Sequence, residues 1–316
     1  MLREIVIISG KGGTGKTCLT AAFAHLAVQP VICDLDVDAP DLHLLLHPQN
    51  LTTQEFISGH TAVITSHCDS CGKCIEGCHF DAIQSQRPHP TVNPLKCEGC
   101  KLCVALCPID AIDFPEKQCG RWHMADTRFG PMVHAQLFPG EENSGRLVTL
   151  LKNKARAFAQ AQQLSLILAD GPPGIGCPVI SSLAGANLVV VVTEPTPSGI
   201  HDLKRVIDLC DHFSLPAGVV INKWDLNVDL SRQIKAFCVR KKITILGQLP
   251  HDPAIVEAMV RGQTITEYTS NGTVELIREI WTAIEALIAM PQNHEPKNVM
   301  ETNSPIENNV ERSNPA

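Results

Sequence analysis

Two runs of cysteines lie inside a nucleotide-binding pattern that starts before them and continues after them. The pattern begins with the glycine-rich segment Gly10–Thr17, which follows a short apolar run. The cysteines then appear with one spacing used twice, C-x2-C-x2-C-x3-C, at Cys68–Cys78 and again at Cys97–Cys107. Apolar runs of the interrupted fold resume at Leu166. A chain of this kind must hold a phosphate site and a set of thiolate ligands in one connected fold.

Short apolar runs alternate with helical stretches along most of the chain. Short apolar runs are typical of buried strands in a parallel sheet, and their alternation with helices favours a doubly wound arrangement. We therefore expect an α/β fold with a doubly wound, mostly parallel sheet. The expected strands are Ile5–Ile8, Val31–Asp36, Leu166–Asp170, Leu188–Thr193, Ala217–Asn222 and Ile243–Leu249. The expected helices include Lys16–Val28, His201–Phe213, Asp229–Arg240 and Thr273–Met290.

The stretch from residue 60 to residue 117 breaks this rhythm. Its two halves repeat one another, because each cysteine run leads into Asp-Ala-Ile, at Asp81–Ile83 and at Asp110–Ile112. This duplication predicts a small α+β domain of residues 60–117, inserted into a nucleotide-binding domain of residues 1–59 and 118–290. Residues 291–316 are rich in Asn, Pro, Glu and Ser, and we expect them to be disordered.

Composition limits the core size, the partners and the cellular location that we expect for the chain. With 316 residues, 44% of them hydrophobic, it can form a large core beside a small domain. The net charge of −7 argues against a general surface for nucleic acid or anionic membrane. The longest apolar run, Leu188–Val192, is too short to cross a bilayer. No secretory signal is recognisable, so we expect a cytoplasmic protein whose 14 cysteines stay reduced and whose clustered cysteines bind metal.

The glycine-rich segment has the setting that a phosphate-binding loop requires. Gly10-x4-Gly15-Lys16-Thr17 follows an expected strand and opens an expected helix. Glycines allow backbone N–H groups to converge on phosphate oxygens, and the helix N-terminus adds positive partial charge. Lys16 is expected to hold the β- and γ-phosphates, and the Thr17 hydroxyl to bind Mg²⁺. The loop residues predicted to bind nucleotide are Gly10, Lys11, Gly12, Gly13, Thr14, Gly15, Lys16, Thr17 and Cys18.

A second lysine, Lys11, opens this loop, and acidic segments end two expected strands at Asp34-Leu-Asp36 and Asp170-Gly-Pro-Pro-Gly174. In this order the segments resemble the MinD/ParA/Mrp family of P-loop ATPases with a deviant Walker A motif, which also includes the nitrogenase iron protein. The resemblance covers nearly all of residues 1–58 and 118–290. It implies ATP and Mg²⁺ as cofactors. It also implies a dimer that forms with ATP, either a homodimer or a heterodimer with a related ATPase.

The resemblance assigns roles to residues around the phosphates. Lys11 would reach the ATP of a partner subunit, Lys16 would hold phosphate and Asp36 would orient the attacking water, so these three are the predicted catalytic residues. Asp34 would lie near Mg²⁺ together with Thr17. The alternatives are a lysine that is simply solvated in a loop and aspartates that only cap strand ends.

Further roles concern the second switch and the base. Asp170 would approach Mg²⁺ through water, and Gly174 would lie near the γ-phosphate. Asn222, in Asn-Lys-Trp-Asp, would read the base, and Pro250 and Asp252 would belong to a second loop beside the adenine.

The cysteine spacing matches that of bacterial ferredoxins with two [4Fe–4S] clusters, in which the fourth cysteine of each run binds the other cluster. Thiolates suit such clusters because the clusters prefer soft, anionic ligands. His79 stands where a proline often follows the fourth cysteine. A pair of zinc sites is the rival reading, but zinc sites usually use two separated CxxC pairs. The predicted ligands are Cys68, Cys71, Cys74 and Cys107 for one cluster, and Cys97, Cys100, Cys103 and Cys78 for the other.

Six cysteines lie outside these runs. Most are expected to be ordinary buried residues. Cys177 lies just after the expected second switch, where the nitrogenase iron protein has a cluster ligand, and we interpret it as structural. Cys119 could be its partner, but nothing in the sequence fixes its position. The full set is Cys18, Cys33, Cys119, Cys177, Cys210 and Cys238.

The combined motifs predict an ATPase that gates electron transfer through two [4Fe–4S] clusters to a redox protein. Assembly or transport of iron–sulfur clusters, as in Mrp-type relatives, is the alternative function. Positioning of the MinD or ParA kind is a third, but the expected final helix carries Glu275, Glu279 and Glu285 against Arg278 alone, which disfavours anionic lipid. We expect neither nucleic acid nor membrane as a partner.

Overall fold

A nine-stranded sheet forms the centre of the computed structural model, which describes residues 2–289. The strand order is β13-β12-β11-β1-β10-β2-β9-β8-β3. The first seven strands in this order are parallel, which confirms the large, mostly parallel α/β sheet expected from the sequence. They are β13 (Thr244–Leu249), β12 (Ala217–Asn222), β11 (Leu188–Thr193), β1 (Arg3–Ser9), β10 (Leu166–Pro173), β2 (Val31–Asp34) and β9 (Gly130–Leu137).

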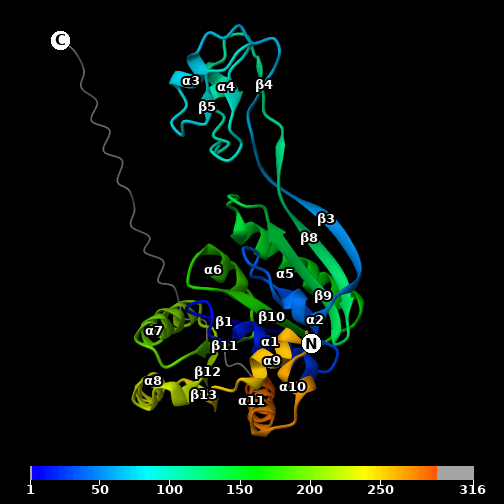
Figure 1. The fold of residues 1–316 in the computed structure, drawn as a ribbon, viewed down its shortest axis with the longest axis vertical. Helices are drawn as coiled ribbons and strands as arrows, with labels where there is room; N and C mark the ends of the chain where they lie inside the picture. Colours follow the sequence, from blue (N-terminus) through cyan, green and yellow to red (C-terminus); the bar gives the residue numbers. More distant parts are fainter. Residues whose placement is uncertain (1, 290–316) are drawn as a thin grey trace, which may run out of the picture.

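Helices cover both faces of this sheet (Figure 1). Successive residues of β1 point to opposite faces, so that Val6 and Ile8 join one buried cluster while Ile5 and Ile7 join the other. The first face packs against α5 (Ser144–Ala161), α6 (Cys177–Leu183), α7 (Pro197–His212) and α8 (Val228–Lys241). The second packs against α1 (Lys16–Leu26), α2 (Leu42–Leu46), α9 (Ala254–Val260), α10 (Ile265–Tyr268) and α11 (Gly272–Ala289). Burial of both faces explains why the central strands are continuously apolar.

Two antiparallel strands that the sequence did not predict extend the sheet on one side. β8 (Glu116–Thr127) pairs with β9, and β3 (Gln49–His60) pairs with β8 at the edge. Most β3 side chains are exposed, and the strand carries threonine, glutamine and glutamate in place of an apolar run. Because only Phe56 and Ser58 of β3 are buried, the strand has too little apolar periodicity for sequence to reveal it.

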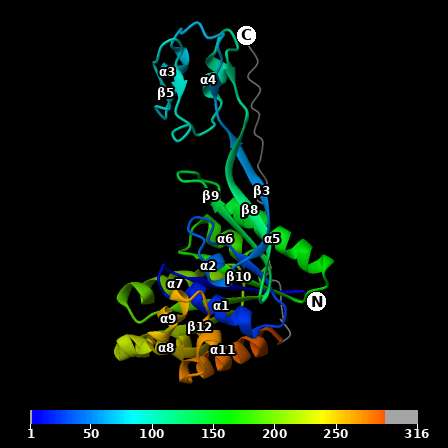
Figure 2. The ribbon, with the colours of Figure 1, turned by 45° about the vertical axis from the view of Figure 1, so that its right-hand side comes forward.

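The cysteine-rich insert stands apart from the sheet at the far end of β3 and β8 (Figures 1 and 2). It contains two small antiparallel sheets, β4 (Val63–Ile64) with β7 (Ile112–Asp113) and β5 (Ile83–Gln84) with β6 (Thr91–Val92). Two short helices, α3 (Lys73–Glu76) and α4 (Leu102–Leu106), complete it.

The sequence duplication of the insert is repeated in its backbone. Asp81 and Asp110 both have positive φ, of 50° and 51°. The next amide in each half, that of Ala82 or Ala111, donates to the sulfur of Cys78 at 3.3 Å or of Cys107 at 3.2 Å. Each half therefore places its fourth cysteine in the same local turn.

One expected helix boundary was wrong. We expected a helix from His201, but α7 begins at Pro197, because the Thr196 hydroxyl accepts the Gly199 N–H at 3.0 Å and so caps an earlier turn. The expectation of disorder for residues 291–316 lies outside the described residues. Between residues 2 and 289, no helix is both long and apolar enough to span a membrane.

Candidate functional site

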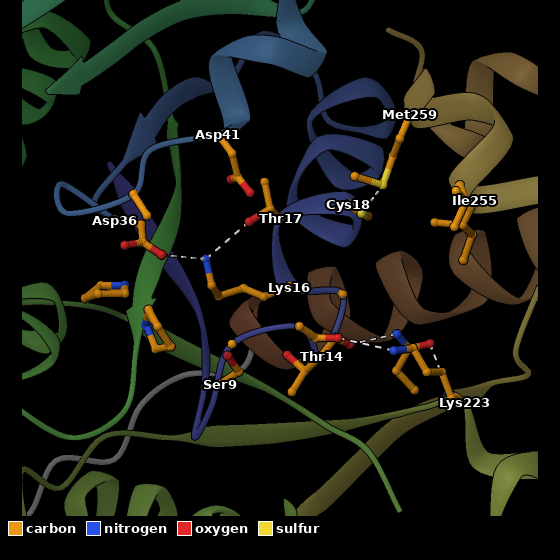
Figure 3. A pocket seen from close by; sticks show the side chains of 18 of the residues that line it. Ser9, Thr14, Lys16, Thr17, Cys18, Asp36, Asp41, Lys223, Ile255 and Met259 are labelled. Atoms are coloured by element: carbon orange, nitrogen blue, oxygen red, sulfur yellow. Dashed lines mark hydrogen bonds and ion pairs between the residues drawn. The ribbon is translucent and has the colours of Figure 1, made fainter. Parts of the chain in front are cut away.

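A cavity of about 640 Å³ lies at the carboxyl ends of the parallel strands. This is where open α/β sheets bind ligands, because the loops that follow the strands diverge there. The first loop, between β1 and α1, forms one wall, and segments from β2, β10, β12 and α9 form the others (Figure 3). Of the predicted residues, the cavity is lined by Gly12–Cys18, Asp36, Asn222, Pro250 and Asp252.

The glycine-rich loop has the backbone that a phosphate cradle requires. Gly13 and Gly15 have φ of 79° and 89°, a conformation that disfavours any residue with a Cβ. The Asn222 side chain fixes the position of the loop, because its amide donates to the Thr14 carbonyl at 2.8 Å. A Cβ on Gly15 would lie 2.5 Å from that same amide nitrogen. The predicted base-reading residue thus also supports the loop.

A buried charge centre lies beside the cavity. The Lys16 ammonium is 2.8 Å from Asp170 and 4.0 Å from Asp36, and it points toward Asp36 in Figure 3. The Thr17 hydroxyl, a predicted Mg²⁺ ligand, donates to Asp170 at 2.7 Å. Burial disfavours the charged form of Lys16, but Asp170, Asp34 and Asp36 outweigh it and raise the lysine pKa. One cation therefore balances several carboxylates in this centre.

Asp34 and Asp36 have different surroundings. Asp34 is fully buried and accepts the N–H groups of Asp36 at 3.1 Å and Leu42 at 3.2 Å, so it anchors the start of α2. Burial and the nearby Asp170 raise its pKa well above the usual value. Asp36 lines the cavity, and burial raises its pKa to about 6. The Mg²⁺ role predicted for Asp34 remains a prediction.

Asp38 and Asp41 also line the cavity, and sequence reasoning did not single them out. Burial and the nearby Asp170 raise the pKa of Asp41, while the charge of Lys16 opposes the rise. The signal available was the run Asp34-x-Asp36-x-Asp38-x-x-Asp41, which places four carboxylates at the end of β2 and in the loop that follows it. Only its first two members matched the family pattern.

Lys11 does not line the cavity; it lies against its own chain. Its ammonium is 2.5 Å from Glu194 and 3.2 Å from the Thr196 hydroxyl. Burial would raise the pKa of Glu194, but Lys11 and Lys223, the latter 3.4 Å away, lower it. Gly10 is also outside the lining, and a Cβ there would lie 2.2 Å from the Asp202 Cβ in α7.

The side opposite the phosphate loop is more apolar. Cys18 contributes a thiol 3.1 Å from the Met259 sulfur, and Ile255 of α9 lies nearby (Figure 3). Asp252 accepts the Thr273 hydroxyl at 2.6 Å, so it links α9 to α11 as well as lining the cavity. Such a wall suits the flat, largely apolar face of a nucleobase. Sequence reasoning missed Ile255 and Met259, since α9 carries no motif.

Two predicted residues of the second switch are engaged elsewhere. Asp170 makes the contacts with Lys16 and Thr17 described above and does not line the cavity. Gly174 has a φ of 92°, and its N–H donates to the Ser9 carbonyl at 2.9 Å. The adjoining Pro172 and Pro173 line the cavity instead.

The eight predicted cluster ligands all lie in the insert. A small cavity there is lined by Cys78, Cys97, Cys100 and Cys103, the four residues that the spacing assigns to one cluster. In the other set, the neighbouring thiols Cys68 and Cys71 contribute to raising the pKa of Cys74, after burial.

The donor chemistry of the insert fits iron–sulfur clusters. Backbone N–H groups point at several sulfurs, as thiolates require; that of Ser70, for example, donates to Cys68 at 3.4 Å. Within residues 2–289, no three His, Cys, Asp or Glu side chains converge on one metal-ion position. The four thiolates of a [4Fe–4S] cluster bind four different iron atoms and lie farther apart than the ligands of a single ion, so they need not converge on one position. The assignment of the eight cysteines to two clusters, four to each, remains a prediction.

Cys177 and Cys119, which lie outside the two cysteine runs, differ in solvent exposure. Cys177 is exposed at the start of α6, whereas Cys119 is buried in β8 and donates to the Ser58 carbonyl at 2.8 Å. Burial and the Glu141 carboxylate raise the pKa of Cys119 to about 11, which disfavours the thiolate that a metal would need. Cys119 therefore behaves as a buried core residue of β8.

The fold and the cavity define a P-loop nucleotide-binding protein. A family model for the CobQ/CobB/MinD/ParA nucleotide binding domain matches residues 5–265. The chain belongs to this family, which confirms the MinD/ParA part of the resemblance. MinD and ParA proteins are ATPases, and this chain is an ATPase of that type.

Individual relatives agree with this assignment. An uncharacterized protein of Methanocaldococcus jannaschii is 36% identical over 230 residues, which cover 72% of this chain and 80% of the relative. An iron-sulfur cluster carrier protein of Pyrococcus abyssi is 20% identical over 295 residues, covering 88% of this chain and 83% of the carrier. The septum site-determining protein MinD of Pyrococcus horikoshii, solved with Mg-ADP, is similar with a TM-score of 0.54 at 17% identity, covering 92% and 98% of the two chains. This last likeness concerns the fold alone.

Proposed function

We propose that this protein hydrolyses ATP to control electron transfer through two [4Fe–4S] clusters held by its insert. The observation that carries the proposal is the attachment of the cysteine-rich insert to the ATPase. β3, which leads to the insert, begins three residues after the end of α2, and Asp34 of the predicted first switch anchors the start of α2. A shift of that switch would therefore reach the insert through α2 and the continuous strand β3.

Residues of the large cavity would carry out the hydrolysis. Backbone N–H groups of Gly12–Thr17 would bind phosphate oxygens, and Lys16 would exchange part of its contact with Asp170 for phosphate. Asp36 would accept a hydrogen bond from the attacking water. Thr17 and Asp34 are the residues proposed to hold Mg²⁺, which neutralises phosphate charge when bound.

Dimerisation would complete the catalytic site. MinD-like ATPases dimerise with ATP, and a homodimer is compatible with the exposed position of the phosphate loop. Lys11, 31% exposed at its side chain, would leave Glu194 and reach the phosphates of the partner's nucleotide. A heterodimer with a related ATPase would place the corresponding lysine in the same way.

The insert would exchange electrons with a separate redox protein. Bound [4Fe–4S] clusters take up and release single electrons. Each predicted ligand set has one exposed cysteine, Cys71 in one and Cys100 in the other. An exposed ligand shortens the path to an outside donor or acceptor, so this arrangement favours exchange with a docked protein.

The test is an anaerobic reductive titration of the reconstituted full-length protein with dithionite, with and without ATP and Mg²⁺. We expect ATP to change the reduction potential of at least one cluster, with a matching change in oligomeric state. Titration curves that coincide with and without nucleotide, in a protein that hydrolyses ATP, would count against gating.

Cluster assembly is the second candidate, because an iron-sulfur cluster carrier protein is among the relatives. Incubation with an apo-acceptor protein and ATP separates the two functions. Movement of iron and sulfide to the acceptor at a rate that depends on ATP would favour the carrier function over electron transfer.

Loss of Cys74 should remove one cluster. Cys74→Ala is expected to lower bound iron and sulfide to about half, since each [4Fe–4S] cluster needs four thiolates. Cys74 is buried, so its loss also disturbs packing; Cys71→Ala removes an exposed ligand of the same predicted set and should give the same iron loss. Cys210→Ala, in a buried position of α7, is the matched control and should keep full iron content. Unchanged iron in both insert variants would remove these residues from the ligand set.

A further inference from the structure

An ion pair connects the base of the insert to the ATPase outside the two long strands. The Lys117 ammonium, at the start of β8, lies 2.8 Å from Glu141 in the loop between β9 and α5. The two side chains are only 17% and 10% exposed. Glu141 also contributes, after burial, to raising the pKa of the Cys119 thiol, so its carboxylate lies close to that buried side chain. A pair this sheltered from water is screened less than an ordinary surface pair.

The same lysine holds the insert segment that leads to a predicted cluster ligand. Lys117 donates to the Pro94 carbonyl at 3.0 Å, three residues before Cys97. The Leu95 N–H donates to the Asn93 side chain at 2.9 Å, so the segment is a closed turn. A Cβ on Gly140 would lie 3.5 Å from the Leu95 side chain, which places the two loops side by side. Residues 93–97 therefore lie beside the loop of residues 138–143 at Gly140, and Lys117 links them to Glu141 of the same loop.

At its other end this loop reaches the helix that follows the predicted second switch. Residue 143 adjoins α5, and a Cβ on Gly145 in its first turn would lie 3.1 Å from the Ser181 hydroxyl and 3.5 Å from the Cys177 Cβ of α6. α6 begins three residues after Gly174. With so little space between α5 and α6, a shift of α6 has to displace the start of α5. In Figures 1 and 2 the β9–α5 connection projects from the sheet toward the insert.

We propose that Lys117 and Glu141 are positioning residues that transmit movement of the second switch to residues 93–97 of the insert. The route runs from Gly174 through α6, the first turn of α5 and the loop of residues 138–143. It is separate from the route through α2 and β3. The mechanical connection does not depend on the proposed function. Its use in electron transfer rests on the proposed function, because residues 93–97 precede a predicted cluster ligand. Nucleotide can drive movement along this route only if the conformations before and after the movement differ in their affinity for nucleotide.

Hydrogen exchange of the full-length holoprotein, with and without ATP and Mg²⁺, tests the proposal. In the unmodified protein we expect ATP to change amide exchange both in α6 and in residues 93–97. In Glu141→Gln, and separately in Lys117→Gln, the ATP-dependent change in α6 should persist, while that in residues 93–97 should shrink about tenfold, equivalent to about 1.4 kcal/mol of lost coupling. Glu142→Gln, an exposed neighbour in the same loop, is the matched control and should behave as the unmodified protein.

The outcomes separate this inference from the proposed function. If the exchange of residues 93–97 responds to ATP equally in the unmodified protein and in both variants, the signal travels through the two strands and the inference is wrong. If that response is lost in the variants but cluster potentials never depend on ATP, the connection stands and electron-transfer gating fails. Melting curves and nucleotide affinities show whether a variant fails to fold. If either Glu141→Gln or Lys117→Gln does so, the other variant provides the test.

Discussion

Lys16→Ala should lose nucleotide affinity by about 100-fold or more, equivalent to about 2.8 kcal/mol, while the iron–sulfur absorbance that we propose for the insert should be unchanged. Lys16 is the only lysine or arginine within 4.0 Å of Asp36 or Asp170 among residues 2–289. Without it, no lysine or arginine would offset the charge of these two carboxylates where the nucleotide phosphates approach them. Isothermal titration with ATP and Mg²⁺, alongside an absorbance spectrum, measures both effects.

The same substitution should also destabilise the ATPase, because it leaves buried carboxylates unpaired. Asp34 and Asp170 are fully buried, and removing the cation of a buried pair typically costs about 3 kcal/mol or more. Lys16→Arg keeps the charge and should recover part of the stability without restoring phosphate geometry. Lys204→Ala, on the exposed face of α7, controls for loss of a lysine as such. A folded Lys16→Ala protein with near-normal affinity would contradict the assignment, and loss of iron in it would mean that the two modules do not fold independently.

Sequence was sufficient for those features whose physical cause is local. The buried parallel strands are continuous apolar runs, and β11 and β12 have the bounds expected from those runs. The phosphate loop could be predicted because its glycines need positive φ, which Gly13 and Gly15 have. Cysteine spacing likewise indicated a duplicated insert, and the matching turns at Asp81 and Asp110 agree with that duplication.

Features set by distant parts of the chain could not be predicted. The strands β3 and β8 pair with each other across the whole insert, so neither carries a local signal for its partner. Lys117 and Glu141 meet only because the β8–β9 hairpin folds back. Met259 enters the cavity wall through α9, which has no nucleotide-binding motif. In each case the tertiary fold, rather than the local pattern, decides which side chains meet.

Asp36→Asn should leave ATP binding nearly intact and lower the rate of hydrolysis by about 100-fold or more, the usual contribution of a positioned proton acceptor. Asp36 lines the cavity with its side chain 17% exposed, so it can reach a water molecule beside the phosphates. Asparagine keeps the shape but cannot accept a proton. Single-turnover hydrolysis with bound ATP, compared with affinity, separates the two effects, and an ATP-dependent dimer should accumulate in the variant.

The pH dependence gives an independent check of the same residue. Burial raises the pKa of Asp36 to about 6, against the opposing effect of Lys16, so the carboxylate form predominates above that value. We therefore expect kcat/KM to fall as pH drops below about 6 and to level off above about 7. Asp36→Asn should lack this titration in its residual activity. If Asp41→Asn abolishes hydrolysis and its pH dependence while Asp36→Asn does not, the water-orienting role belongs to Asp41, which also lines the cavity.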